Sequence, residues 1–194
     1  MSEPADPIAR FNEALRRAEA LEPDVPNAIT LATADGDGRP SARVVLLHRA
    51  DERGFTFFTN YNSRKGRDIE QNNKASLLFF WPEFERQVRI QGVIARLPEE
   101  DSDEYFRSRP LESQIGAWAS RQSEVIGSRD ELDGRFSEVL GRYAESGIPR
   151  PAHWGGFVLT PSYFEFWQGR AARLHDRLRY VQAGKGWKLE RLMP

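Results

Sequence analysis

Cysteine is absent from the 194-residue sequence, which excludes disulfide bonds, thiol nucleophiles and cysteine-ligated metal sites. Long apolar runs are absent too. None approaches the roughly 20 residues of a membrane-spanning helix, and the polar N-terminal residues include no apolar signal core. No His-x-x-x-His pair or other zinc signature occurs, so we predict no metal site. We expect a soluble cytoplasmic protein that does not enter a membrane.

An excess of either charge is also missing. Lys and Arg total 28 and Asp and Glu total 29, which gives a formal net charge of −1. A dedicated nucleic-acid-binding protein usually carries a net basic charge, so we expect no nucleic-acid partner. Basic residues cluster locally instead, and such clusters on a neutral background suit a small anionic ligand. The Gly-x-Ser-x-Gly motif is absent as well, which argues against a Ser-His-Asp hydrolase.

The residues that are present suffice for one sizeable core. Hydrophobic residues make up 39% of the chain, which has twelve Phe and five Trp, and its length suits one domain. We predict a single domain over residues 1–194. Residues 1–26 would form an N-terminal helix and lead-in, and residues 27–194 would form the main body.

Most of the main body is predicted to be β-structure. An amphipathic helix over Pro7–Leu21 comes first, and Glu22–Pro26 ends it. Aromatic and β-branched runs then predict strands over Ala28–Thr33, Ser41–Leu47, Phe55–Thr59, Ala75–Trp81, Gln87–Leu97, Phe157–Thr160, Tyr163–Phe166, Leu178–Val181 and Trp187–Leu192. Asp35–Gly38 and Ala183–Gly186 are predicted turns. Many antiparallel strands with peripheral helices predict a β-barrel, a mainly β fold class.

Two further helices are predicted within this β-structure. One covers Ser63–Gln71, with Ser63 as its N-cap. The other opens at the capping box Ser128–Glu131 and is stopped by Gly147 and Pro149. Both are predicted to be peripheral to the β-structure.

The segment Glu165–Arg177 carries an unusual set of side chains. Arg173, His175 and Arg177 alternate in the sequence, so they share one face if the segment is extended. Such a face suits a polyanionic ligand and proton transfer. Trp167 could form an apolar wall for a flat ligand. A solvated hairpin edge is an equal alternative on the local pattern.

A second candidate site lies in Thr59–Gly66, which follows a strand and opens a helix. Backbone N–H groups at a helix start, with Arg64 and Lys65 beside them, can bind an anion. A solvated helix start is the alternative reading. Arg43, within an apolar strand, must face outward or meet an anion or a carboxylate.

Two other segments could bind a ligand. Gln87, Arg89 and Gln91 share one face of a strand. That face is either the solvated side of a barrel strand or part of a cofactor pocket, where a Gln would donate to and accept from the edge of a heteroaromatic ring. The segment Tyr105–Ser123 is dense in Arg, Ser, Tyr and Gln, which are donors suited to phosphate. Spacing alone does not establish either site.

Several short motifs occur in a fixed order along the chain: Arg43–Leu47, Thr59–Asn60, Ser63–Lys65, Arg86–Val88, Tyr105–Phe106, Ser108–Pro110, Ser113–Gly116, Arg121–Ser123, Trp154–Gly156, Glu165–Gly169 and Arg173–Arg177. Together they resemble the pyridoxamine/pyridoxine 5′-phosphate oxidase family, in register from about Asn27 to Pro194. The resemblance implies an FMN-binding split β-barrel that works as a homodimer, with two FMN sites at the subunit interface.

The resemblance also implies site residues. FMN contacts would come from Arg43, Val44, Phe58, Thr59, Arg64, Lys65, Gln87, Gln122, Ser123, Trp167 and Arg177. Contacts to the phosphorylated pyridine substrate would come from His48, Tyr105, Arg109, Ser113, Arg173 and His175. Arg173 and His175 are the predicted catalytic residues: both would orient the substrate, and His175 is expected to help move a proton.

By the same resemblance, the activity is that of a pyridoxal 5′-phosphate synthase in vitamin B6 metabolism. Pyridoxamine or pyridoxine 5′-phosphate gives a hydride from C4′ to flavin N5, and O2 reoxidises the flavin with release of H2O2. Ammonia is released when the substrate is the amine. The flavin carries the redox chemistry, and the protein supplies orientation and charge.

Two departures from the family pattern keep alternatives open. His48 stands where the family usually has a lysine that contacts the substrate phosphate, and a neutral imidazole gives less charge and less reach. The family's N-terminal arm is mostly missing, so we expect incomplete closure of the active site. A related split-barrel oxidase with another substrate, as in phenazine biosynthesis, is one alternative. A flavin- or pyridoxal-phosphate-binding module without turnover is the other.

Overall fold

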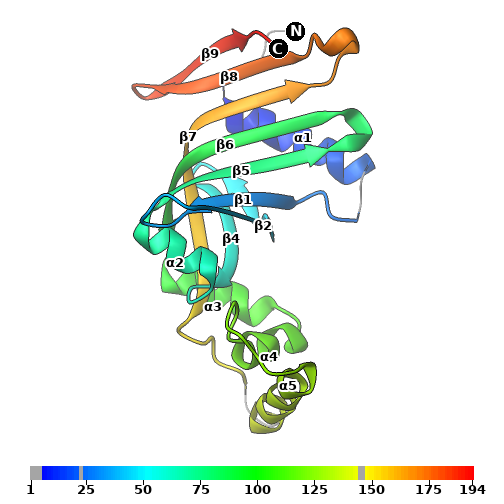
Figure 1. The fold of residues 1–194 in the computed structure, drawn as a ribbon. Coiled ribbons are helices and arrows are strands. Elements are labelled where there is room, and N and C mark those ends of the chain that lie inside the picture. Colours follow the sequence, from blue (N-terminus) through cyan, green and yellow to red (C-terminus); the bar gives the residue numbers. More distant parts are fainter. Residues whose placement is uncertain (1–5, 22–23, 144–146) are drawn as a thin grey trace.

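A nine-stranded antiparallel sheet dominates the fold (Figure 1). The structure, a computed structural model, describes residues 6–21, 24–143 and 147–194. The strands are β1 (Ala28–Ala34), β2 (Pro40–Leu46), β3 (Arg49–Asp51), β4 (Gly54–Asn60), β5 (Lys74–Trp81), β6 (Arg86–Arg96), β7 (Trp154–Gln168), β8 (Asp176–Ala183) and β9 (Gly186–Leu192). Their order is β2-β1-β5-β6-β7-β4-β3, with β8 beside β7 and β9 beside β8.

The long strand β7 divides the sheet. One edge of β7 pairs with β6 along nearly its whole length. The other edge pairs first with β4, over Trp154–Leu159, and then with β8, over Tyr163–Gln168. The sheet therefore curls as a half-barrel whose two arms diverge at β7 (Figure 1). The predicted mainly β, split-barrel fold class is confirmed.

Aromatic side chains form the main core under helix α1 (Pro7–Leu21). The Phe11 ring of this helix lies 4.9 Å from Phe55 and 4.8 Å from Phe79, centroid to centroid. Strand alternation buries Val88 and Ile90 on this side and leaves their neighbours on the other face of the sheet. The predicted N-terminal helix is confirmed with its bounds. Residues 22 and 23, part of the predicted break, lie outside the described residues.

A smaller helical module packs at the other end of the molecule. It consists of α3 (Glu99–Ser108), α4 (Leu111–Ala119) and α5 (Arg129–Tyr143), and its separate core includes Phe106 and Ile115. Only α5 was predicted. Its Ser128 Oγ accepts the Glu131 N–H at 3.1 Å, as expected, but the Glu131 carboxylate accepts from Gly127 N–H and not from Ser128.

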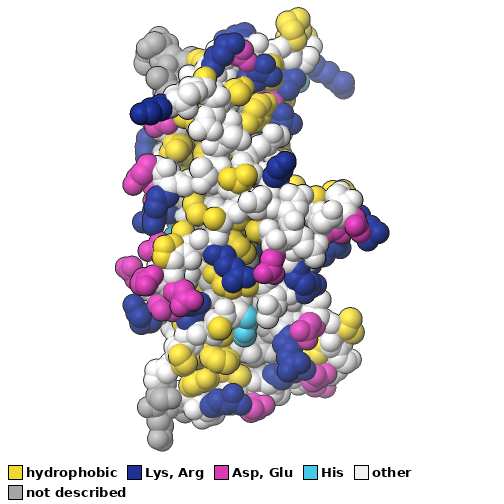
Figure 2. All heavy atoms as spheres, turned by 90° about the vertical axis from the view of Figure 1, so that its left-hand side faces the viewer, with side chains coloured by type: hydrophobic (Ala, Val, Ile, Leu, Met, Phe, Trp, Pro, Cys, Tyr) yellow, Lys and Arg dark blue, Asp and Glu magenta, His cyan; other side chains and the backbone are white. Residues whose placement is uncertain are grey.

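The other predicted helix is confirmed as α2 (Arg64–Gln71), and both predicted turns join the expected strands. Two strand predictions, Phe157–Thr160 and Tyr163–Phe166, are parts of the single strand β7. β3 was not predicted. Among the described residues, no helix is long and apolar enough to cross a membrane. Figure 2 shows basic and acidic side chains interspersed on one face, in keeping with the balanced charge.

The condition for one shared face of Arg173, His175 and Arg177 is not met. Arg173 and His175 do not lie on an extended segment, because residues Ala171–Arg173 form a 3-10 turn and β8 begins at Asp176. Ala172 and Arg173 have φ values of 57° and 60°. The left-handed backbone reverses the chain direction, so only Arg177 of the alternating set lies on a strand.

Candidate functional site

A buried lysine lies at the N-terminus of α2. Ser63 caps this helix, since its Oγ accepts the Gly66 N–H at 3.4 Å. The Lys65 side chain folds back over the helix end. Its Nζ donates to three neutral oxygens: Thr59 Oγ1 at 3.0 Å, Ser63 Oγ at 3.2 Å and Gln122 Oε1 at 2.9 Å.

This environment lowers the pKa of Lys65 from 10.5 to about 8. Loss of solvation is the larger cause, and the nearby guanidinium of Arg43 is the second. A buried ammonium whose partners are all neutral is stabilised when an anion binds next to it. The start of α2 is therefore suited to a phosphate group.

The loop that follows α4 lies against the same helix end. Ser123 Oγ accepts the Arg64 backbone N–H at 3.2 Å, and Ser123 itself has a φ of 74°. Gln122 Oε1 accepts from the Thr59 hydroxyl at 3.2 Å as well as from Lys65. The structure thus brings together five of the predicted FMN contacts from three separate segments.

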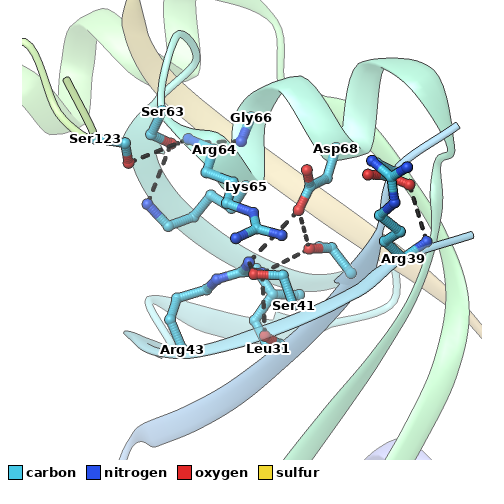
Figure 3. A network of polar contacts seen from close by, with 12 residues as sticks. Leu31, Arg39, Ser41, Arg43, Ser63, Arg64, Lys65, Gly66, Asp68 and Ser123 are labelled. Carbon is cyan, nitrogen blue, oxygen red and sulfur yellow. Dashed lines mark hydrogen bonds and ion pairs between the residues drawn. The ribbon is translucent and has the colours of Figure 1, made fainter. Parts of the chain in front are cut away.

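Arg43 reaches this area from β2 (Figure 3). Its Nη1 donates to Thr33 Oγ1 at 2.7 Å, and its Nη2 donates to Ser41 Oγ at 2.6 Å and lies 3.6 Å from Asp68 Oδ2. Burial lowers the pKa of Arg43, and the Asp68 carboxylate opposes that shift. Of the two options left by the sequence, Arg43 meets a carboxylate, and it does so directly beside Lys65.

Aromatic rings form a wall next to this cationic site. The Phe58 ring lies 4.0 Å from Tyr105 and 5.5 Å from Trp154. The His48 ring packs on the same group, 4.3 Å from Tyr105 and 5.1 Å from Phe58. Partial burial lowers the pKa of His48, so its imidazole is neutral at pH 7. A flat apolar ligand could pack against this wall.

A second cationic group lies at the wall. The Arg109 guanidinium carbon is 4.4 Å from the centroid of the Trp154 ring. Its Nη1 is buried and has no hydrogen-bond partner in the described part of the chain, and burial lowers the pKa of Arg109. Ser113 lines a pocket of about 360 Å³ together with Arg109 and Trp154. A buried guanidinium donor without an acceptor is what a phosphate oxygen would satisfy.

One pocket of about 470 Å³ joins the two cationic groups. Lys65 and Gln122 line it together with Arg109. Its further lining comes from Asn27, Val44, Val45, Leu46, Leu47, His48, Phe58, Thr59, Tyr105 and Trp154. The pocket can therefore receive a ligand or a ligand pair with two anionic ends and a flat apolar middle.

A second group of predicted residues lies across β6, β7 and β8. Gln87 is in register with Trp167, and Trp167 is in register with Arg177. Directly opposed residues of antiparallel strands project to the same face. These three side chains therefore form one row on the face of the sheet opposite the core.

His175 and Arg173 lie in the turn beside this row. The His175 ring is 4.5 Å from the Trp167 ring, and its Nδ1 accepts the Arg170 N–H at 3.2 Å. Because Nδ1 accepts, the neutral imidazole carries its proton on Nε2. Arg173 is exposed. The predicted catalytic residues thus lie with the predicted flavin wall and not with Tyr105 and Arg109.

The two groups lie toward opposite ends of β7 (Figure 1). Trp154 lines the pocket, and Trp167 is 13 positions further along the strand, a path of roughly 40 Å at the usual strand rise. The lining of the 470 Å³ pocket includes none of Gln87, Trp167, Arg173, His175 and Arg177. Within the described residues, one protomer offers two partial sites.

These donors fit FMN by their chemistry. Lys65 and its hydroxyl neighbours suit a phosphate, and the Gln87–Trp167 row offers a flat wall with an amide beside it. Trp154 was missed as a site residue, although it lines the pocket and stacks with Phe58. The Trp154–Gly156 motif was its only signal in the sequence.

Comparison with known proteins gives matches over the whole length of the chain. A protein-family model described as pyridoxamine 5′-phosphate oxidase matches residues 17–143, and one described as the pyridoxine 5′-phosphate oxidase C-terminal dimerisation region matches residues 154–194. The chain is 54% identical over 191 residues to the pyridoxine/pyridoxamine 5′-phosphate oxidase of Bordetella petrii, covering 98% of this chain and 90% of that protein. It is 55% identical over 192 residues to that of Burkholderia mallei, covering 97% and 89%.

Solved structures resemble the fold closely. PhzG from Burkholderia lata, solved in complex with tetrahydrophenazine-1-carboxylic acid, has a TM-score of 0.94 at 35% identity and covers 100% of this chain and 95% of that one. A pyridoxamine 5′-phosphate oxidase-related, FMN-binding protein from Nostoc punctiforme has a TM-score of 0.77 at 19% identity and covers 100% of both chains. The second likeness concerns the fold alone.

Proposed function

The chain belongs to the pyridoxamine 5′-phosphate oxidase family, and on that premise we propose that it makes pyridoxal 5′-phosphate. Its cofactor is FMN. The substrates are pyridoxamine 5′-phosphate and pyridoxine 5′-phosphate, O2 is the electron acceptor and H2O2 the second product. When bound, FMN supplies the two-electron redox chemistry, which no side chain of the protein can supply.

One observation carries the proposal: two separate cationic sites flank the aromatic wall of a single pocket. Among the described residues, Lys65 donates only to neutral oxygens, and Arg109 has a buried donor without an acceptor. The cofactor and the substrate each bring one phosphate. We assign the FMN phosphate to the Lys65 site and the substrate phosphate to Arg109, with Tyr105 and Ser113 beside it.

The second group of residues completes the site from another subunit. The C-terminal match to a dimerisation region covers β7 to β9, with Trp167 on β7, Arg177 on β8 and His175 in the turn between these strands. In a homodimer, the row of one protomer faces the pocket of its partner. Two equivalent FMN sites at the interface follow from the twofold symmetry of such a dimer.

The protein's own groups then bind, orient and move a proton. The rings of Phe58, Tyr105 and Trp154 exclude water from one side of the substrate. Arg173 orients the substrate by its charge. His175, whose proton lies on Nε2 when the ring is neutral, exchanges a proton with the substrate's C4′ substituent.

A second candidate function is the oxidation of a phenazine precursor. The 35% identity and TM-score of 0.94 to PhzG favour it, as does the neutral His48 in the pocket. The higher identity to the Bordetella and Burkholderia oxidases favours the pyridoxal 5′-phosphate reaction. A flavin-binding module without turnover is the non-enzymatic alternative.

Turnover assays separate these functions. The purified protein is examined for a flavin spectrum and given pyridoxamine 5′-phosphate under air, while aldehyde and H2O2 are followed. Tetrahydrophenazine-1-carboxylic acid is the competing substrate. A yellow protein that forms neither product from the pyridoxamine ester contradicts the first function. A protein that oxidises neither compound supports the binding module.

A matched variant tests the substrate phosphate site. Arg109→Gln removes the charge beside the wall, and we expect the KM for pyridoxamine 5′-phosphate to rise on the order of 100-fold, since hydrogen bonds to charged groups are the strong ones. The KM for unphosphorylated pyridoxamine should change little. Equal changes for both substrates would contradict the assignment of Arg109.

A further inference from the structure

A buried carboxylate, Glu165, lies on the same face of the sheet as the Gln87–Trp167–Arg177 row. It stands two positions before Trp167 on β7, and only 6% of it is exposed. Three donors surround it: Arg177 Nε at 2.8 Å, the Tyr163 hydroxyl at 2.8 Å and Arg89 Nη2. Burying a carboxylate without such partners would be costly, so Glu165 and the groups that donate to it form one interacting unit.

Glu165 fixes the guanidinium of Arg177. This group is anchored at two points, by Nε on Glu165 and by Nη1 on the Met193 carbonyl at 3.0 Å. Met193 is 85% exposed at the chain end, so Glu165 is the anchor inside the sheet. Because a guanidinium is planar, holding Nε sets the direction of its remaining donors.

Glu165 also balances charge on this face. Its pKa is lowered although burial acts to raise it, because the hydrogen bonds from Arg177 and Tyr163 and the charge of Arg89 favour the ionised form. The ion pair in turn raises the pKa of Arg177. Without the carboxylate, Arg89 and Arg177 would be neighbouring cations with no counter-charge between them.

We propose that Glu165 is a positioning residue for the cofactor. It holds Arg177 in the orientation that meets FMN and thereby raises the affinity of the protein for FMN, without contacting FMN itself. The inference rests on the proposed function in one respect, the assignment of Arg177 to FMN. Glu165 belongs to the Glu165–Gly169 motif, in which only Trp167 had been given a role.

A double-mutant cycle on FMN binding tests this role. The apoprotein is titrated with FMN by flavin fluorescence for the wild type, Glu165→Gln, Arg177→Gln and the double variant. We expect Glu165→Gln to weaken binding by about tenfold, equivalent to a coupling of about 1.4 kcal/mol. The double variant should bind no more weakly than Arg177→Gln alone, because Glu165 acts through Arg177.

Controls separate positioning from general damage. Glu190→Gln removes another carboxylate that accepts from an arginine of β8, Arg179, at 2.6 Å, and it should leave FMN affinity within about twofold. Thermal unfolding of each apoprotein shows whether the fold is kept. If Glu165→Gln does not fold, Tyr163→Phe loosens the carboxylate without altering charge and should weaken FMN binding by about threefold.

Two outcomes overturn the proposal. One is an FMN affinity of Glu165→Gln within twofold of that of the wild type. The other is that Glu165→Gln weakens FMN binding equally in the wild-type and in the Arg177→Gln background. The titration contains no substrate. A chain that binds FMN but does not oxidise pyridoxamine 5′-phosphate therefore contradicts the proposed function and leaves this test intact. A wild-type chain that does not bind FMN overturns both.

Discussion

Lys65 Nζ donates to Gln122 Oε1 at 2.9 Å across 57 positions of sequence. The contact ties the start of α2 to the loop after α4, so the two segments form one continuous surface, to which we assign the FMN phosphate. The acceptor is neutral and the lysine is buried, which destabilises the charged form of Lys65 until an anion arrives. We therefore expect the protonation of Lys65 to be linked to the binding of a phosphate.

The first prediction concerns pH. Free Lys65 has a pKa lowered to about 8, and a bound phosphate raises it by favouring the ammonium. Below pH 8, Lys65 is protonated in both the free and the phosphate-bound protein. As the pH rises through 8, the free protein loses this proton and binding must restore it, so FMN affinity falls and binding takes up a proton.

Calorimetry at pH 8.5 in two buffers of different ionisation enthalpy measures that proton uptake. Lys65→Gln is the control, because it removes the titrating group and should bind FMN weakly with no proton uptake from this site. Wild-type binding without proton uptake at this pH would contradict the linkage.

The second prediction concerns the backbone of the same helix end. A Cβ at Gly66 would lie 1.9 Å from the Tyr61 carbonyl oxygen, which is a backbone atom that cannot swing away. We expect Gly66→Ala to lower the free energy of unfolding by about 3 kcal/mol and to displace Lys65 from its partners.

Gly141→Ala is the matched control, since Gly141 lies in α5 and a Cβ there meets nothing within 4 Å. Alanine favours a helix over glycine, so this variant should gain up to about 1 kcal/mol. Urea unfolding of both variants measures the difference. Similar stabilities for the two would show that α2 can shift away from Tyr61.

The third prediction concerns His48, at a position where the resemblance to the family implies a lysine. The imidazole packs 4.3 Å from Tyr105 and is neutral at pH 7 because burial lowers its pKa. We expect His48→Lys to lower the KM for pyridoxamine 5′-phosphate about fivefold, which is about 1 kcal/mol for an added charge at a partly exposed site.

Steady-state kinetics test this expectation, with His48→Gln as a variant that changes shape but not charge. An unchanged KM in His48→Lys would mean that the phosphate lies out of reach of this position. If the phenazine precursor is the true substrate, His48→Lys should not lower the KM for that compound.

Local patterns were enough for much of the fold. The Ser63 cap and the strands of alternating residues were predictable, since caps and strand faces depend on neighbours in sequence. The helix α3 was not predicted, because Tyr105 and Phe106 are its only aromatic or apolar residues. The helix α4 was not predicted although it is rich in apolar residues, because its Ser and Gln residues were interpreted as part of a phosphate site. Phe106 and Ile115 are buried by Val139 and Trp154 from distant segments.

The candidate site was harder to predict for the same reason. The left-handed φ values of Ala172 and Arg173 occupy positions where a sequence pattern would call for glycine. No local sequence signal therefore predicted the turn, and an extended segment was only one possible reading of the alternating residues. The pairing of Gln87 with Trp167 depends on sheet register, which only the folded chain supplies.

The last prediction tests whether each site draws on two subunits. Lys65→Gln disables the pocket, and Trp167→Ala disables the row at the other end of β7. If a site combines the pocket of one protomer with the row of its partner, a mixed dimer contains one site with both defects and one intact site. Random mixing of equal amounts yields half mixed dimers, so about a quarter of the sites should recover activity.

Differently tagged variants, unfolded in urea together and refolded, allow this measurement, with each variant refolded alone as the control. If the pocket and the row of each site belonged to the same protomer, every site would contain one defect and mixing would restore no activity. Recovery near a quarter of wild-type activity would instead require the row to act on the partner's pocket, since no protomer in the mixture is intact.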